Sequence, residues 1–218
     1  MRHGNVSWRS CAWQAMFSAV IPYYSYKNSM STKYKFKDQD KLYFVSFAVV
    51  YWIDLFTRNE YRNILLESWK YCQSKKGMDL YAWCIMTSHV HMIIGSHGGK
   101  LEDIMRDMKR HTSEALKKAI QTHPGESRRE WMLSLMERAG KKNSNNLNFQ
   151  LWQQDNHPIE LATPVIAHQK LDYLHYNPVV AGIVEKPEDY LYSSAIDYYT
   201  NRKGMIDIIL IDPILQNL

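Results

Sequence analysis

Two histidines one residue apart are the side chains of this sequence best suited to chemistry. His89 and His91 flank Val90 inside a largely apolar stretch, residues 83–94. Side chains alternate between the faces of a strand, so both imidazoles are predicted to leave the same face of one strand. Two neutral imidazoles displayed together supply half of a divalent metal site. A third ligand and a nucleophile must then come from elsewhere in the chain.

A helix far downstream is the candidate source of both groups. Thr163 followed by Pro164 is a favourable helix start, with a capping hydroxyl and a proline in the first turn. Asn177 followed by Pro178 predicts the end of the helix, because a residue before proline is biased away from helical angles. The sequence therefore predicts a helix over residues 165–177.

Tyr173 and Asn177 are four residues apart on this helix and therefore share a face. A phenol hydroxyl and an amide oxygen placed in this way can both point at a metal held by the histidines. Tyr176 points about 60° away from Tyr173 around the helix, so angle alone leaves it open as the nucleophile.

Further segments occur in a fixed order around these residues. They are the His89–Val90–His91 triplet, residues 152–158, 173–179, 181–184 and 187–190, and the pair Ser193–Ser194. The set closely resembles the REP-associated tyrosine transposases, single-tyrosine enzymes with a His-hydrophobe-His motif that are related to small bacterial insertion-sequence transposases. The resemblance covers about residues 34–199, with a poor match over residues 121–148.

The resemblance implies a role for each of the candidate residues. His89 and His91 would be ligands of Mg²⁺ or Mn²⁺, and Tyr173 would be the nucleophile. Insertion-sequence relatives complete the metal site with a glutamine one turn after the tyrosine. Asn177 stands at that position here, as in the REP-associated branch, and is implied as the third ligand. The alignment of Asp172 and Tyr173 with the nucleophile position of the family favours Tyr173 over Tyr176.

The same resemblance implies a DNA transposase. It would cleave and rejoin single-stranded DNA in hairpin-forming palindromic repeats, through a covalent 5′-phosphotyrosine, as a monomer or a homodimer. A domesticated hairpin-DNA-binding protein without strand transfer is the main alternative. A metal-dependent hydrolase is a second alternative, because His-x-His also opens amidohydrolase barrels. In those barrels of ~250 residues the motif belongs to the first strand, whereas here it lies in the middle of the chain.

The charge balance agrees with a nucleic-acid partner. The 218 residues contain 27 Lys and Arg against 22 Asp and Glu, a net charge of +5. Four basic residues on one predicted helix are candidates for binding DNA phosphates: Lys109, Arg110, Lys117 and Lys118.

The cysteines and the hydropathy bear on the cellular compartment. Cys11, Cys72 and Cys84 show neither metal spacing nor a disulfide framework, which suits a reducing cytoplasm and a place at the nucleoid. No apolar stretch approaches the ~20 residues that a membrane helix requires, so we expect no membrane partner.

Apolar spacing predicts an alternation of strands and helices. The predicted strands cover residues 42–50, 80–86, 89–94 and 149–153. The predicted helices cover residues 58–75, 101–120 and 127–138, and the tyrosine helix follows them. Gly77 is the predicted stop signal of the first of these helices. This order predicts an α+β, ferredoxin-like antiparallel sheet with the histidine strand central, helices on one face and the nucleophile on a C-terminal helix.

The ends of the sequence differ from its middle. Residues 1–29 contain no acidic side chain, and Met30 precedes the family-like region as a natural start would. We expect residues 1–29 to be a disordered extension or the product of a mis-assigned start, residues 30–200 to form the catalytic domain, and residues 201–218 to form a tail.

Overall fold

The strands and helices follow one another much as the apolar spacing predicts. The computed structural model describes residues 36–143, 148–154 and 156–211. Within these residues the strands are β1 (Tyr43–Ala48), β2 (Met78–Ile85), β3 (His89–Ser96) and β4 (Ile159–Glu160). The helices are α2 (Asn59–Lys76), α3 (Leu101–Thr122), α4 (Arg129–Lys141), α5 (Pro164–Val180) and α6 (Ala195–Tyr199). Short 3-10 turns are η1 (Val50–Trp52), η2 (Leu55–Thr57) and η3 (Pro187–Asp189).

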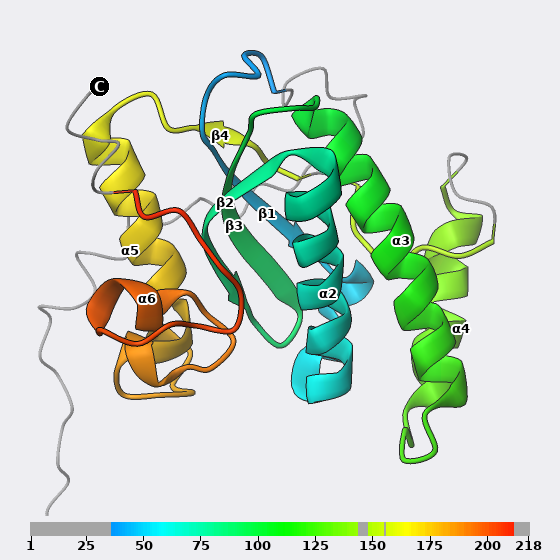
Figure 1. The fold of residues 1–218 in the computed structure, drawn as a ribbon. Helices are drawn as coiled ribbons and strands as arrows, with labels where there is room; N and C mark the ends of the chain where they lie inside the picture. The colour runs from blue at the N-terminus through cyan, green and yellow to red at the C-terminus, as the bar shows by residue number, and fades with distance from the viewer. Residues whose placement is uncertain (1–35, 144–147, 155, 212–218) are drawn as a thin grey trace, which may run out of the picture. The chain divides into compact units, whose positions relative to one another are not determined.

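The strands form one antiparallel sheet in the order β2-β3-β1-β4 (Figure 1). β3 pairs with β1 on one side and with β2 on the other, so the histidine strand is central, as predicted. A β-α-β-β-α-β path with the first and third strands in the middle of the sheet is the ferredoxin-like arrangement. The predicted α+β fold class is therefore confirmed.

Helices cover both faces of the sheet, which corrects the expectation that they lie on one. Trp83 and Cys84 are neighbours on β2 and so point to opposite faces. Trp83 packs edge to face against Trp69 of α2, with ring centroids 5.6 Å apart. Cys84 pairs across the sheet with His91, whose ring contacts Tyr173 of α5. The crossover helices thus fill one face, and α5, which follows the last strand, covers the other (Figure 1).

Helix α2 ends at Gly77, as predicted. This glycine has a φ of 69°, in the left-handed region, and its N–H bonds to the carbonyl of Cys72. A Cβ at the same position would lie only 2.8 Å from the backbone nitrogen of Gly98. Both the backbone conformation and the available space therefore require glycine here.

Helix α5 begins where predicted and runs further than predicted. The Thr163 side chain caps it by accepting a hydrogen bond from a first-turn backbone N–H, and Pro164 occupies the first turn. The prediction that the helix ends at Asn177 is wrong, because α5 continues through Pro178 to Val180.

Pro178 is tolerated because it lies in the last turn of α5. Only its own N–H is missing, and the amides that follow still find acceptors. Ala181 N–H donates to the Asn177 carbonyl at 3.0 Å, and Ile183 N–H donates to the Pro178 carbonyl at 2.9 Å. Gly182, with a φ of 70°, then turns the chain away. Asn177 consequently lies inside a hydrogen-bonded turn rather than at a frayed end.

The strand predicted over residues 149–153 is reduced to a single bridge between Trp152 and Val49. The Trp152 ring is buried against Phe47, and its indole N–H donates to Thr112 Oγ1 at 3.0 Å. The apolar side chains of this segment fill the core instead of forming a ladder. The fourth strand is β4, whose two residues pair with β1.

The C-terminal part of the described chain covers the outer edge of β2. Ser194 N–H donates to the Trp83 carbonyl at 2.9 Å, and Ile209 N–H donates to the Leu80 carbonyl at 2.9 Å. Backbone groups that an edge strand would leave open are thereby paired.

The predicted domain boundaries stay predictions. Residues 1–29 and 212–218 lie outside the described residues. Within residues 201–211, the described part of the predicted tail, Ile206 and Ile211 are buried in the core. In the part of the chain that the structure describes, no helix has the length and apolar character to cross a bilayer. Cys72 and Cys84 are buried free thiols, and Cys11 lies outside the described residues.

Candidate active site

The two histidines of β3 lie ring against ring on the face that α5 covers. The centroids of His89 and His91 are 4.8 Å apart, with the ring planes at 79°. Burial lowers the pKa of His89 to about 4. Burial also holds the pKa of His91 well below its usual value, and the charges of His89 and Lys170 act in the same direction. Both imidazoles are therefore neutral near pH 7, the form that binds a divalent cation.

Asn177 reaches the same histidine from helix α5. Its Nδ2 lies 3.1 Å from His91 Nε2. His89 Nδ1 lies 3.2 Å from Ser88 Oγ, so Nε2 is the ligand atom that His89 has available. The structure thus brings together the two histidines and the amide that the sequence predicts as a ligand set.

This donor set fits a divalent cation without selecting one. Within the described residues there is no group of three or more His, Cys, Asp or Glu side chains that could hold a metal. The amide oxygen of Asn177 stays the predicted third protein donor, although Nδ2 is the amide atom that faces His91 Nε2. Carbonyl oxygens suit Mg²⁺ or Mn²⁺, whereas imidazoles suit softer ions. His91 Nδ1 is buried and has no hydrogen-bond partner among the described residues, whereas Asn177 contacts the Nε2 atom of the same ring.

Tyr173 stands beside His91 with part of its surface open to solvent. Its ring centroid is 5.2 Å from that of His91 and 5.9 Å from that of Phe44. The residue is 38% exposed. Burial raises the pKa of its hydroxyl, and a hydrogen bond with Asn177 acts in the opposite direction. One amide therefore contacts both the phenol and the buried imidazole.

Tyr176, the tyrosine that the helix angle left open, lies elsewhere. Its ring contacts Tyr199 of α6, with centroids 6.4 Å apart. Among the described residues, the ring of Tyr173 contacts His91, whereas the ring of Tyr176 does not contact His91. The packing of α5 therefore separates the two tyrosines that sequence spacing could not.

Lys170 is a residue of this site that sequence reasoning missed. Its ammonium lies 5.2 Å from the ring centroid of Phe44 and 5.6 Å from that of Tyr173. The side chain is half-buried, and burial lowers the pKa of its ammonium. No ion pair of Lys170 is found within the described part of the chain. The available signal was its spacing, because a residue three before Tyr173 shares its helix face.

A buried hydrogen bond fixes α5 against the sheet. His175 is fully buried, and its Nε2 lies 2.9 Å from Ser194 Oγ. The same hydroxyl accepts a hydrogen bond from Trp83 N–H of β2 at 2.9 Å. This chain of contacts gives Ser194 a role that the sequence did not show, since it docks the helix that carries Tyr173.

The turn after β1 places a further aromatic side chain beside the histidines. Tyr51 and Trp52 of η1 have φ values of 56° and 54°, in the left-handed region. That conformation costs roughly 1–2 kcal/mol per non-glycine residue. Trp52 is 59% exposed, and its ring centroid lies 5.4 Å from that of His89 in an edge-to-face contact.

Residues that follow α3 form hydrogen bonds with the segment just after this turn. Arg128 donates from Nη1 to the Asp54 carbonyl at 3.0 Å and from Nη2 to Thr57 Oγ1 at 3.2 Å. Glu126, buried between Arg128 and Arg58 at 3.2 and 2.9 Å, orients both guanidinium groups. Glu126 and Arg128, to which the sequence assigns no role, therefore support the segment that follows Trp52.

Lys109, predicted to bind phosphate, is engaged within the fold. Its Nζ donates to the Gln153 carbonyl at 2.9 Å and to Asn156 Oδ1 at 2.7 Å. It also lies over the ring of Phe47, on the face of the sheet opposite to His91.

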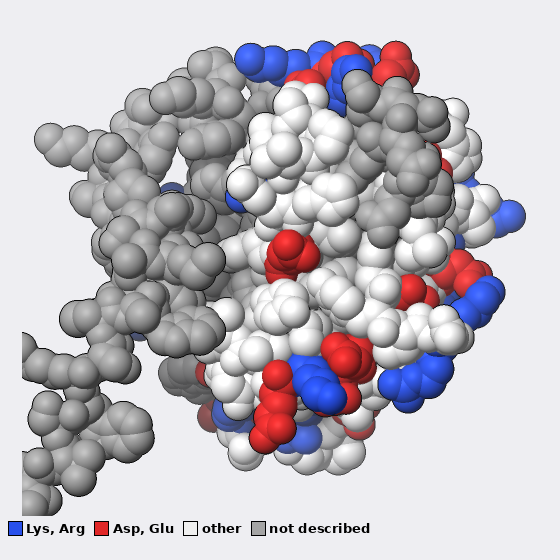
Figure 2. Space-filling view, turned by 90° about the vertical axis from the view of Figure 1, so that its left-hand side faces the viewer, with Lys and Arg blue, Asp and Glu red and all other residues white. Residues whose placement is uncertain are grey.

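The other three predicted phosphate ligands also lie on α3, which packs against α2 rather than α5. Lys117 lies over the Phe149 ring at 4.6 Å, Arg110 pairs with Asp107 at 3.3 Å, and Lys118 is exposed. The structure does not bring these residues to the histidines, and their contact with DNA stays a prediction. Figure 2, which views the molecule from the side of α5 and α6, shows a largely uncharged surface among the residues that it colours.

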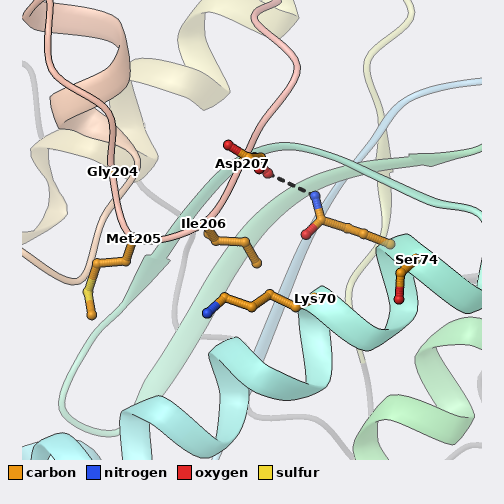
Figure 3. Close-up of a pocket in the computed structure, with 7 residues that line it drawn as sticks. Lys70, Ser74, Gly204, Met205, Ile206 and Asp207 are labelled. Atoms are coloured by element: carbon orange, nitrogen blue, oxygen red, sulfur yellow. Dashed lines mark hydrogen bonds between the residues drawn. The ribbon is translucent and has the colours of Figure 1, made fainter.

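A surface hollow between α2 and the chain after α6 is separate from this site (Figure 3). Gln73 Nε2 donates across it to the Asp207 carbonyl at 2.8 Å. Its lining residues are Lys70, Gln73, Ser74, Gly204, Met205, Ile206 and Asp207. None of them is a candidate site residue.

Known proteins are similar to this chain in part of its sequence and in its fold. Residues 40–135 match the family model described as Transposase IS200 like, a segment that contains both histidines and ends before α5. No curated protein matches the sequence. A solved structure described as a REP-associated tyrosine transposase bound to a REP hairpin is similar, with a TM-score of 0.52 and 15% identity over 77% of this chain and 84% of that chain. By its matched segment the chain resembles the IS200-like transposases, and by its fold it resembles the REP-associated tyrosine transposase.

Proposed function

We propose that the chain is a transposase that cleaves and rejoins single-stranded DNA at hairpin-forming repeats through a covalent bond to Tyr173. One observation carries the proposal: the Tyr173 ring lies 5.2 Å from that of His91, and Asn177 Nδ2 lies 3.1 Å from the same imidazole. A nucleophile and a set of metal donors thus converge from a strand and a helix far apart in the sequence. The family match and the fold shared with a hairpin-bound relative support the same class.

The reaction is an in-line exchange of one phosphate ester for another. Tyr173 Oη attacks the phosphorus, the bond to the 3′ oxygen breaks, and a 5′-phosphotyrosine and a free 3′-hydroxyl result. The phenol loses its proton and the leaving oxygen gains one. Burial raises the pKa of Tyr173, and the hydrogen bond with Asn177 offsets only part of this effect. A Mg²⁺ or Mn²⁺ ion on His89, His91 and Asn177 would polarise the phosphate and stabilise the leaving oxygen.

The covalent intermediate explains why a tyrosine suits a transposase. The phosphotyrosine keeps the energy of the phosphodiester, so the 3′-hydroxyl of another strand can attack it and release Tyr173. A nuclease that uses water loses that energy at the first step. Lys170, whose ammonium lies over the Tyr173 ring without a carboxylate partner in the described chain, is placed to hold an oxygen of the scissile phosphate.

The test is the capture of the adduct with a 3′-labelled single strand from the palindromic repeats beside the gene. The label stays on the fragment joined to the protein, so the adduct is visible on a denaturing gel. We expect an adduct that excess chelator or His91→Ala abolishes. DNA binding should survive both changes, since phosphate contacts come mainly from basic side chains.

Two tyrosine variants locate the nucleophile. Tyr173→Phe removes one hydroxyl and should abolish the adduct while preserving fold and DNA affinity. Tyr176→Phe is the matched control and should form the adduct normally. A phosphotyrosyl peptide that contains Tyr176, or an adduct undiminished by chelator, would overturn the assignment. Hairpin binding without any adduct in Mg²⁺ or Mn²⁺ would instead indicate the domesticated DNA-binding protein.

A further inference from the structure

We propose that Trp52 is a stacking platform for an unpaired base of the DNA strand next to the scissile phosphate. The inference rests on the proposed function, because it needs a single strand at the histidines. Its geometry is independent of that function: the indole is 59% exposed, and its ring centroid lies 5.4 Å from that of His89.

The stability of the fold does not explain this residue. A tryptophan stabilises a protein by burying its ring, and this ring is mostly in water. Its backbone is also left-handed, with a φ of 54°, as is that of Tyr51 before it. Glycine would adopt the same backbone without strain. Strain at an exposed aromatic residue beside a candidate active site is typical of a side chain held in place for a ligand.

Hydrogen bonds on both sides hold the backbone of the turn that carries the indole. Trp52 N–H donates to the Val49 carbonyl at 3.0 Å, and Val50 N–H donates to the Leu151 carbonyl at 2.8 Å. On the other side, Arg128 holds the carbonyl of Asp54 at 3.0 Å. A backbone that is already hydrogen-bonded loses less entropy when a ligand binds beside it.

The chemistry of the exposed ring fits a nucleobase. The contact with His89 is edge to face, with the planes at 71°, so at least one face of the indole is left free by it. Every base has a π-face, and stacking of a base on an aromatic side chain is a common mode of single-strand binding. Because His89 marks where the phosphodiester must lie, the base that stacks belongs to a nucleotide beside the cleaved bond.

The experiment combines protein variants with an abasic scan of the strand. Binding of the single strand is followed by fluorescence anisotropy, with one abasic nucleotide moved stepwise through the cleavage site. We expect Trp52→Ala to weaken binding of the intact strand roughly tenfold. One abasic position should weaken binding by the unaltered protein to a similar extent and leave Trp52→Ala unaffected. Trp52→Phe should restore part of the affinity.

Control variants separate stacking from other effects. Tyr71→Ala removes an equally exposed aromatic residue, 57% against 59%, from α2 on the opposite face, and should bind normally. Trp52→Ala should bind Mn²⁺ with the same affinity as the unaltered protein. This result would exclude that the substitution weakens DNA binding by disturbing His89. Trp52→Gly should melt close to the unaltered protein, because relief of the left-handed strain offsets the loss of the edge-to-face contact with His89.

The outcomes distinguish this inference from the proposed function. If Trp52→Ala binds the intact strand as the unaltered protein does, or shows the same abasic profile, the platform is overturned while adduct formation by Tyr173 is untouched. If the abasic profile depends on Trp52 but no adduct forms, the platform stands and the cleavage proposal fails. Absence of any binding to single strands by the unaltered protein overturns both.

Discussion

Single residues on α5 determine the chemistry, and Lys170 is the one that no motif indicates. Its ammonium lies 5.6 Å from the Tyr173 ring centroid and is placed to bind a phosphate oxygen. We expect Lys170→Met to slow adduct formation on the order of 100-fold, the loss typical of a removed charge-stabilising group. Lys170→Arg should fall in between. The measurement is a single-turnover rate with the 3′-labelled strand.

The control for this variant is Lys186→Met, an exposed lysine beyond the end of α5. It should react at the normal rate, and both variants should keep their melting temperatures, since the Met side chain retains most of the apolar stem of lysine. An unchanged rate in Lys170→Met would show that the ammonium only packs over the rings.

At the same scale, sequence predicted the parts of the site that depend on local periodicity. Alternation along a strand placed His89 and His91 together, and the helical repeat placed Tyr173 and Asn177 on one face. The choice between Tyr173 and Tyr176 depends on how α5 packs, which no local spacing specifies. Trp52 had no local signal either, because its neighbour His89 is distant in the sequence.

Among the elements, those with strong periodicity and clear end signals were predicted well. The apolar repeat and Gly77 defined α2, and the apolar flanks of the histidines defined β3. The errors have physical causes. Pro178 does not end α5, because a proline in a last turn removes only one hydrogen bond. Residues 149–153 looked like a strand because their apolar side chains fill the core, whereas β4 has only two residues and no distinctive composition.

Helix α3 gives an element-scale prediction that separates structural from DNA-binding cations. Arg110 and Lys118 are exposed, so Arg110→Gln with Lys118→Gln should leave the melting temperature unchanged. If they contact phosphates of a hairpin, the slope of log affinity against log salt should shrink by roughly one to two units. Lys109→Gln should instead lower the melting temperature, because its ammonium bonds to Gln153 and Asn156. An unaltered salt slope in the double variant would assign both cations to a solvated face.

For the molecule as a whole, acid should reduce stability through the buried His175. Burial lowers the pKa of His175 from 6.5 to about 3. Between these values the unfolded chain binds a proton that the folded chain does not, so stability is present above pH 6.5 and falls as the pH drops towards 3. This group alone contributes up to about 1.4 kcal/mol per pH unit. Melting temperatures recorded from about pH 7 to 4 measure it.

His175→Gln lacks this titration and should show a shallower loss over the same range. Glu126 affects the stability of the protein over a lower range of pH. Burial raises the pKa of its carboxyl, but hydrogen bonds from Arg128 and Arg58 outweigh burial and bring it from 4.5 down to about 2. Its contribution is therefore lost only as the pH falls from 4.5 towards 2. If the unaltered protein and His175→Gln lose stability in parallel as the pH falls, His175 takes up its proton in the folded state.

The covering of the β2 edge has a consequence for how the protein tolerates truncation. Every residue proposed for the chemistry, from Trp52 to Asn177, precedes the segment that pairs with Trp83 and Leu80. A chain cut after α5 would keep all of these groups. It would also expose an apolar strand of eight residues with open N–H and C=O groups, which is a template for pairing with other chains. Such a fragment would fail by aggregation, although it lacks no catalytic side chain.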